Sequence, residues 1–238
     1  MTRPLSIVLA IFVSAALNSP ASGLLLMDQI GADGSFQEGL SNNTTQISNF
    51  YASATQFNVA VADDFAVENA ATLTGLEVAL FASNATQGFG VLAALRINLY
   101  DAQPTAANFA TGNVLSIDIP VAVIDFTSPW TSSSLTRLAA IDLSALELTL
   151  DPGSYWVSVV AQNNSFQTDI GILMSSFAGT PGNDNARQIG SGLWGGGGDR
   201  ALGADAALRV YGNVVPEPSS LLLLGSGVLA LARRRRAR

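Results

Sequence analysis

The 238-residue chain contains no cysteine, no histidine and no lysine, and these absences exclude most familiar kinds of active site. Without histidine there is no imidazole base, no Ser-His-Asp triad and no imidazole metal ligand. Without cysteine there is no thiolate nucleophile, no disulfide and no zinc or iron–sulfur centre. Without lysine there is no Schiff base and no P-loop. The side chains left for chemistry are carboxylates, hydroxyls and arginine.

Positive charge is scarce between the two apolar ends of the chain. Residues 24–215 contain five arginines and 17 acidic side chains, which gives a net charge of −12. A domain with this charge repels phosphate, so the sequence argues against nucleic acid as a partner. The range is long enough for one sizeable domain with its own core.

The N-terminus has the three-part layout of a secretory signal peptide. Arg3 precedes the apolar run 5–17, and a stretch of small and helix-breaking residues follows. Cleavage after Ala21 or Gly23 leaves small residues at the −3 and −1 positions. An uncleaved anchor is the alternative, but the run is short of the roughly 20 residues that span a bilayer. We therefore predict export and a cleaved signal peptide over residues 1–23.

Three ordered elements form the C-terminus: a tripeptide, the apolar segment 219–232 and a basic cluster. The tripeptide is Pro216, Glu217 and Pro218, and the cluster begins with Arg233, Arg234, Arg235 and Arg236. Proline does not fit inside a helix, so the tripeptide marks the start of one. A helix over 219–232 spans roughly 21 Å, and snorkelling arginines extend its reach across a bilayer core of about 30 Å. The arginines stay cytoplasmic, which places the preceding residues outside.

This tail resembles the PEP-CTERM sorting tail of Gram-negative bacteria, in which a Pro-Glu-Pro tripeptide, a glycine-containing apolar helix and arginines follow one another. The resemblance covers residues 214–238, with Gly225 and Gly227 as the helix glycines. It implies a processing exosortase and a host that makes exopolysaccharide. It also implies tethering to the inner membrane with the domain on the periplasmic side, and then release to the cell surface or medium. A plain tail anchor that no enzyme reads is the alternative.

Tails of this kind are also named the C-terminal domain of ice-binding proteins. Ice-binding surfaces use regular Thr-x-Thr ladders, and this sequence contains no such regular ladder. The resemblance therefore informs the sorting of the chain and leaves the activity of its domain open.

Between the two ends, apolar and polar residues alternate with a period of two, which is typical of half-buried β-strands. The alternating segments are 57–61, 76–80, 95–99, 115–119, 146–150, 155–159 and 208–210. Loops are predicted at 101–113, 127–134 and 179–185, a few helical turns around 105–110, and a type II turn at 151–154. This pattern predicts one all-β domain over residues 24–213, folded as an antiparallel β-sandwich or jelly roll.

Two adjacent carboxylates, Asp63 and Asp64, follow one of the predicted strands. Calcium takes six to eight oxygen ligands, so this pair is a candidate for a structural calcium site. Neighbouring side chains of a strand point to opposite faces, so both can share an ion only at a bend. The alternative is a solvated strand end. Apart from calcium, the sequence predicts no cofactor.

A glycine-rich polar segment over 179–199 contains Asn183, Asp184, Asn185 and Trp194. An aromatic ring beside amides and carboxylates is typical of a sugar-binding site. Trp130 is a second candidate for sugar contact. The alternative is that Trp194 packs over an end of the sandwich. Trp156 lies in a predicted strand and is expected to be packed.

A glycoside hydrolase needs two carboxylates about 5–9.5 Å apart, one of them with a raised pKa. No pair stands out in the sequence. We therefore predict a non-enzymatic, exported surface or extracellular-matrix protein that is associated with polysaccharide. A carbohydrate-binding module with a specific sugar site and a carboxylate-dependent glycoside hydrolase are the alternatives.

Overall fold

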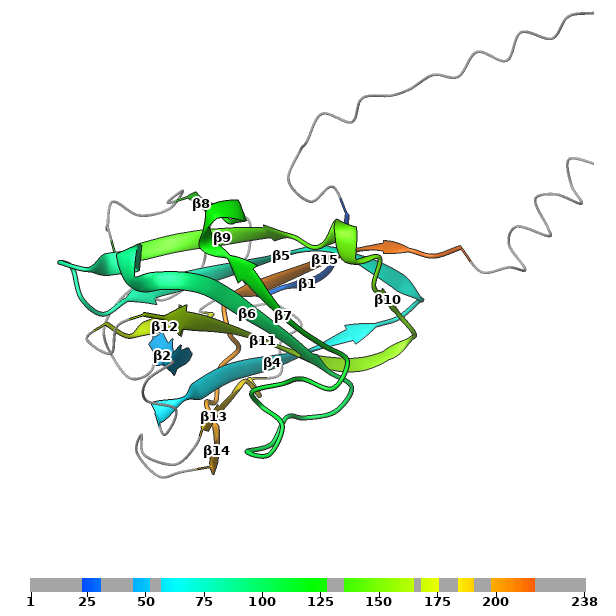
Figure 1. The fold of residues 1–238 in the computed structure, drawn as a ribbon. Helices are drawn as coiled ribbons and strands as arrows, with labels where there is room; N and C mark the ends of the chain where they lie inside the picture. The colour runs from blue at the N-terminus through cyan, green and yellow to red at the C-terminus, as the bar shows by residue number, and fades with distance from the viewer. Residues whose placement is uncertain are drawn as a thin grey trace, which may run out of the picture.

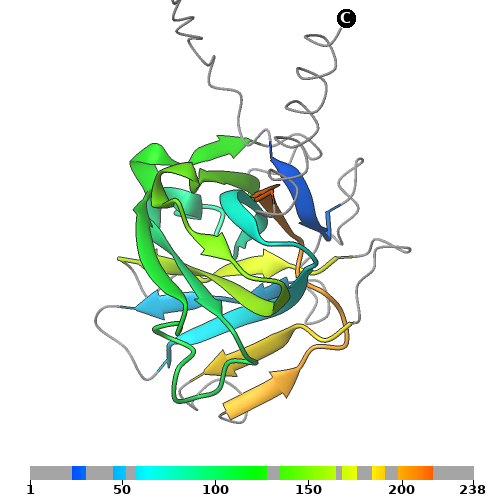
Figure 2. The same cartoon turned by 90° about the vertical axis from the view of Figure 1, so that its right-hand side faces the viewer.

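The computed structural model describes residues 23–30, 45–51, 57–127, 135–164, 168–175, 184–190 and 198–216. These residues form two β-sheets packed face to face (Figures 1 and 2), and their only helices are short 3-10 turns. The turns are η2 (Gly88–Val91), η3 (Val121–Val123) and η4 (Ser144–Leu146). The all-β prediction is thereby confirmed. The predicted signal helix and C-terminal helix lie outside the described residues.

The first sheet has eight strands arranged around the long central strand β5. On one side β5 pairs with β15 and β12, and on the other with β9 and β10. The strands are β1 (Leu24–Asp28), β2 (Thr45–Ile47), β5 (Ala71–Ala82), β8 (Asp125–Thr127), β9 (Thr136–Asp142), β10 (Thr149–Leu150), β12 (Ile170–Leu173) and β15 (Leu208–Val214). β1 is an edge strand that pairs with β15, so the first and last described strands are neighbours.

The second sheet has seven strands in the order β14-β13-β4-β3-β11-β6-β7. They are β3 (Asn49–Tyr51), β4 (Val59–Val67), β6 (Leu92–Tyr100), β7 (Leu115–Pro120), β11 (Gly153–Asn163), β13 (Arg187–Gly190) and β14 (Gly198–Ala201). One pairing departs from the predicted antiparallel arrangement, since β3 runs parallel to β11. β4 and β11 are antiparallel to each other and separate at one end, where β3 enters between them. A strand in that place must be parallel to one neighbour.

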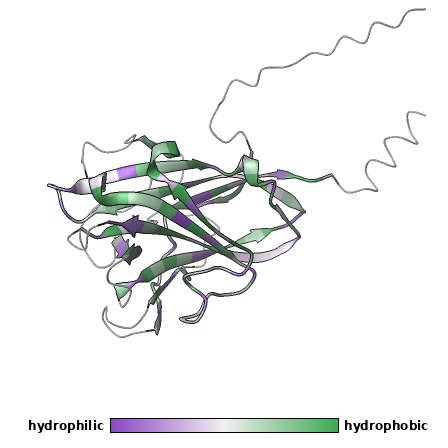
Figure 3. Cartoon of the chain, in the orientation of Figure 1, coloured by the Kyte–Doolittle hydropathy of each residue, from purple (hydrophilic) through white to green (hydrophobic). Residues whose placement is uncertain are grey.

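The main core lies between the sheets and follows the predicted period of two. Hydrophobic and hydrophilic residues succeed one another along the strands (Figure 3), and the apolar ones of both sheets meet in a single cluster. From the first sheet come Leu76, Val78, Leu80, Leu208 and Val210; from the second come Leu95, Ile97, Leu99, Val157 and Val159. Burial of each such side chain stabilises the fold by about 1.5–3 kcal/mol.

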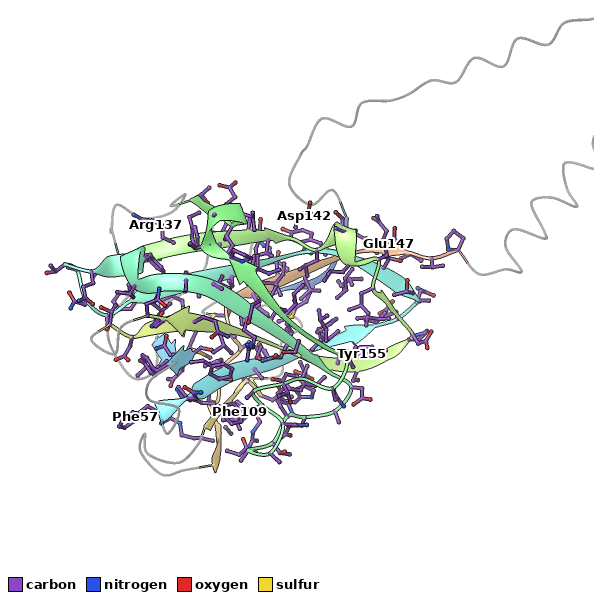
Figure 4. The ribbon with its side chains drawn as sticks, in the orientation of Figure 1. Phe57, Phe109, Arg137, Asp142, Glu147 and Tyr155 are labelled. Atoms are coloured by element: carbon purple, nitrogen blue, oxygen red, sulfur yellow. The ribbon has the colours of Figure 1, made fainter. Side chains whose placement is uncertain are left out.

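The outer face of the second sheet is also buried, which the period of two does not predict. The loop between β6 and β7 folds back over this face and brings Phe109 (labelled in Figure 4) against Phe50, with ring centroids 5.8 Å apart. Tyr100 and Asn98 point outward from β6 and donate hydrogen bonds to the Phe109 carbonyl at 2.6 and 3.2 Å. Trp156 is buried in the same cluster, as predicted.

Three local predictions need correction. The predicted strand 146–150 begins only at Thr149, because η4 is followed by Glu147 in the left-handed region at φ 49° (Figure 4). The predicted type II turn at 151–154 requires a positive φ at Gly153, but Gly153 has no positive φ and starts β11. The helical turns predicted around 105–110 form only single turns, with Phe109 N–H donating to the Thr105 carbonyl at 2.9 Å.

Candidate functional site

The structure separates Asp63 from Asp64. Val61 and Phe65 of β4 point into the core between the sheets, and Asp63 shares their face, whereas Asp64 and Ala62 point the other way. Asp63 is completely buried, while Asp64 is partly exposed. β4 has no bend at this point that would turn both side chains to one side, because its pairing with β11 is regular. The two adjacent side chains therefore lie on opposite faces of β4, and calcium binding by either of them stays a prediction.

Asp63 connects β4 to the segment that precedes β15. Its Oδ2 accepts a hydrogen bond of 2.8 Å from the Ala206 N–H, and its Oδ1 accepts one of 3.0 Å from the Asp64 N–H. Burial raises the pKa of Asp63 well above its usual value, and the negative charge of Asp205 raises it further. Two acidic groups thus come close in a region of low dielectric constant, where an unneutralised charge is costly.

Asp205 lies at the start of this segment and is 6% exposed. Its Oδ1 is buried and accepts no hydrogen bond. The backbone N–H groups of Asp184 and Asn185 face the carboxylate and lower its pKa, but burial and the charge of Asp184 outweigh them and raise it. The Asn185 side chain adds a second oxygen, Oδ1, that is buried without a partner. We call Asp63, Asn185 and Asp205 the Asp205 group.

A groove of about 400 Å³ opens between β1 and β4. Asp28, Asp64 and Glu68 contribute acidic side chains to its lining. Gln29 also lines it and has a third buried oxygen, Oε1, without a partner. The Gln29 N–H donates to the Leu208 carbonyl at 2.9 Å, which places this residue beside the segment that carries Asp205.

A second set of acidic side chains, on the first sheet, has its own cation. Arg209 Nε donates to Asp28 Oδ1 and Nη1 donates to Glu77 Oε2, both at 2.9 Å. The Tyr211 hydroxyl donates to the same Glu77 oxygen at 3.0 Å. Burial and the charge of Glu77 raise the pKa of Tyr211 to about 12. We call these four residues the Arg209 group.

The predicted sugar-binding residues are only partly described. Trp194, Trp130 and Asn183 lie outside the described residues. Asp184 is exposed and adopts a left-handed backbone with φ 54°, and Asn185 follows it with its side-chain oxygen buried. The two described residues of that prediction therefore belong to the turn beside Asp205, where Asn185 faces inward.

Sequence reasoning missed Asp205 and Gln29. Asp205 stands alone among alanines just before a strand, in Ala204-Asp205-Ala206-Ala207, and a single acid in an apolar setting was the available signal. Among the described residues, no three acidic side chains gather into a cluster that could hold a metal ion. Any ion at the Asp205 group therefore depends on amide and backbone oxygens as well as on carboxylates.

A backbone hydrogen bond lies at the C-terminal border of the described residues. The Val215 N–H donates to the Ala70 carbonyl at 2.7 Å, and Pro216 follows. Glu217, Pro218 and the arginines at 233–236 lie outside the described residues. No helix within the described part of the chain has the length and hydropathy needed to cross a bilayer.

Comparison with known families identifies this tail. The model of the PEP-CTERM protein-sorting motif matches residues 214–236, which confirms the resemblance inferred from the tripeptide, the apolar segment and the arginines. The motif is typical of exported proteins that an exosortase sorts. No curated protein matches the chain.

Proposed function

We propose that this protein is a non-enzymatic component of the cell surface or extracellular matrix, tethered to the inner membrane by its tail and then released by an exosortase. The observation that carries the proposal is the match of the sorting motif to residues 214–236, directly after β15. β15, the last of the described strands, ends at Val214, so removal of the residues after Pro216 would take no residue from the described sheets.

The two ends of the domain lie together, which suits a tethered precursor. Leu24 pairs with Gly212 across β1 and β15, so the chain enters and leaves the sandwich at one end (Figure 1). Among the described residues, four of the five exposed large apolar side chains lie there: Leu24, Leu25, Val214 and Val215. Residues 216–218 span at most about 11 Å, so this end stays close to the membrane before processing.

The burial of the Asp63 and Asp205 carboxylates supports a non-enzymatic role for this pair. A glycosidase holds its two carboxylates against a substrate. Asp63, whose pKa the charge of Asp205 helps to raise, is 0% exposed and Asp205 is 6% exposed, so neither is accessible to a polysaccharide chain. Association with exopolysaccharide through Trp194 or Trp130 stays a prediction.

Processing is tested by mapping both termini of the full-length protein with mass spectrometry. The protein is recovered from an exosortase-bearing host and from the same host without exosortase. We expect the mature surface protein to lack residues 233–238 only where the enzyme is present. Glu217→Ala should retain the tail, whereas Glu68→Ala, which removes an acid from the folded domain, should be processed normally. Intact arginines on surface protein from the exosortase-bearing host would contradict the proposal.

A further inference from the structure

The Asp205 group contains negative charge and oxygen acceptors but no cation. Arg96, Arg187 and Arg209 form salt bridges with Asp118, Asp199, Asp28 and Glu77. None of these bridges reaches Asp63 or Asp205. Two carboxylates are therefore buried together with backbone N–H groups as their only described donors.

The unpartnered atoms of this region are all oxygens. Asp205 Oδ1 and Asn185 Oδ1 are buried without a hydrogen bond, and so is Oε1 of Gln29, which directly follows β1. Buried acceptors are normally satisfied, and each unsatisfied one carries a desolvation cost of about 1–3 kcal/mol. A set of buried oxygens with few donors is what a cation would satisfy, since one cation can accept lone pairs from several oxygens at once.

We propose that the Asp205 group binds a calcium ion, with Asp205 Oδ1 and Asn185 Oδ1 as ligands and the Asp63 carboxylate beside them. Carboxylate and amide oxygens are hard ligands that suit calcium, which tolerates irregular geometry and completes its shell with backbone carbonyls and water. Softer metals prefer imidazole and thiolate, and the chain has neither. Magnesium fits less well because it demands a near-ideal octahedral shell and keeps its waters.

The surroundings favour entry of a divalent cation. The groove between β1 and β4 presents Asp64 and Glu68, together with Asp28, whose charge Arg209 balances, and an acidic lining of this kind concentrates cations. The three residues of the Asp205 group come from β4, from the turn before β13 and from the segment before β15. An ion bound there therefore connects both sheets, and it should stabilise the native state by mass action.

The test is thermal unfolding of the full-length chain in detergent at neutral pH, after EDTA treatment. Addition of about 5 mM CaCl₂ should raise Tm by roughly 5 °C or more, whereas NaCl of equal ionic strength should not. Asp205→Asn should abolish the calcium response, and Asp125→Asn, which removes an exposed acid elsewhere, should keep it. Asn185→Asp adds a carboxylate to the group and should enlarge the response to calcium.

Several outcomes would overturn the proposal. An unchanged Tm of the wild-type chain in calcium would show that a shared proton, rather than a cation, neutralises Asp63 and Asp205. A full calcium response in Asp205→Asn would place the ion elsewhere, and an equal response to MgCl₂ would remove the assignment to calcium. If Asp205→Asn does not fold, calorimetric titration of the wild-type chain and of Asn185→Asp with CaCl₂ decides the question, because a ligand at position 185 must change the affinity.

Discussion

The Arg209 group and the Asp205 group solve the same electrostatic problem in different ways. Arg209 and Asp205 lie four residues apart in the chain, and each is surrounded by acidic side chains. In the Arg209 group one guanidinium on β15 bridges carboxylates of the two flanking strands, β1 and β5, and a tyrosine hydroxyl completes the set. In the Asp205 group, backbone N–H groups face the carboxylates and side-chain oxygens are left without partners.

The difference shows how a domain with few arginines distributes them. Residues 24–215 contain 17 acidic side chains and only five arginines that could balance their charge. Arginine is placed where carboxylates lie on adjacent strands within reach of a planar donor group, as on β1, β5 and β15. The Asp205 group draws its residues from three chain segments, and its described hydrogen-bond donors are backbone N–H groups.

Removal of Arg209 should have the largest effect on stability. Arg209→Ala leaves Asp28 and Glu77 largely buried without a cation, which should cost about 3 kcal/mol in the free energy of unfolding. Chemical denaturation at pH 7 measures this loss. Arg200→Ala is the matched control, because Arg200 donates a hydrogen bond to the neutral Gln46 side chain, and its removal leaves no buried carboxylate without a cation at that contact.

This variant also tests whether the two groups are independent. Arg209→Ala should keep the calcium-induced rise in Tm of the wild-type chain, since none of its salt bridges involves the Asp205 group. Loss of the calcium response in Arg209→Ala would show that the Arg209 group and the Asp205 group form a single network rather than two independent ones.

Replacement of Asp63 should have an intermediate effect. Asp63→Ala leaves the N–H groups of Ala206 and Asp64 without an acceptor, whereas Asp63→Asn removes the charge but keeps an amide oxygen. We expect Asp63→Ala to be less stable than Asp63→Asn by about 1–3 kcal/mol in the absence of calcium. Urea denaturation of both variants measures the difference. Equal stabilities would mean that the carboxylate contributes through its charge alone.

The sequence predicted the core of this fold well because apolar and polar residues alternate with a period of two along half-buried strands. Leu95, Ile97 and Leu99 were expected on one face, and they lie in the core between the sheets. The same alternation wrongly predicts that Asn98 and Tyr100 on the opposite face are exposed, because the loop after β6 covers them. A period of two marks which side chains share a face, but it does not say whether a distant segment covers that face.

The candidate site was predictable only in part for a related reason. Asp63 was selected because it stands next to Asp64, yet alternation along β4 places the two on opposite faces. Its actual neighbour, Asp205, is 142 positions away in the sequence. The two residues come together because β4 and β13 belong to one sheet and β15 to the other, and the two sheets pack face to face. The spacing of residues along the sequence carries no information on a contact between such distant positions. The tail is the opposite case, because its three elements are contiguous and local order alone identifies it.

The smallest expected effect on stability concerns an exposed ion pair on the second sheet. Arg96 donates to both oxygens of Asp118, at 2.7 and 2.8 Å, and Gln162 donates to Oδ1 at 3.1 Å. The side chains of the pair are 29% and 47% exposed, so solvent screens their attraction and the pair should contribute about 0.2–1 kcal/mol. A double-mutant cycle of Arg96→Ala and Asp118→Asn at pH 7 measures this coupling.

The pH dependence of this pair has a definite sign. The hydrogen bonds from Arg96 lower the pKa of Asp118 below the usual value of 3.8. The folded state thus binds the proton more weakly than the unfolded state, so the coupling is fully present above pH 4 and is lost as the pH falls through the lowered pKa. About 1 M NaCl should also weaken it, while the mostly buried Arg209 group should respond less. A coupling that persists after Asp118 is protonated would show that shape and neutral hydrogen bonds, rather than charge, join Arg96 to Asp118.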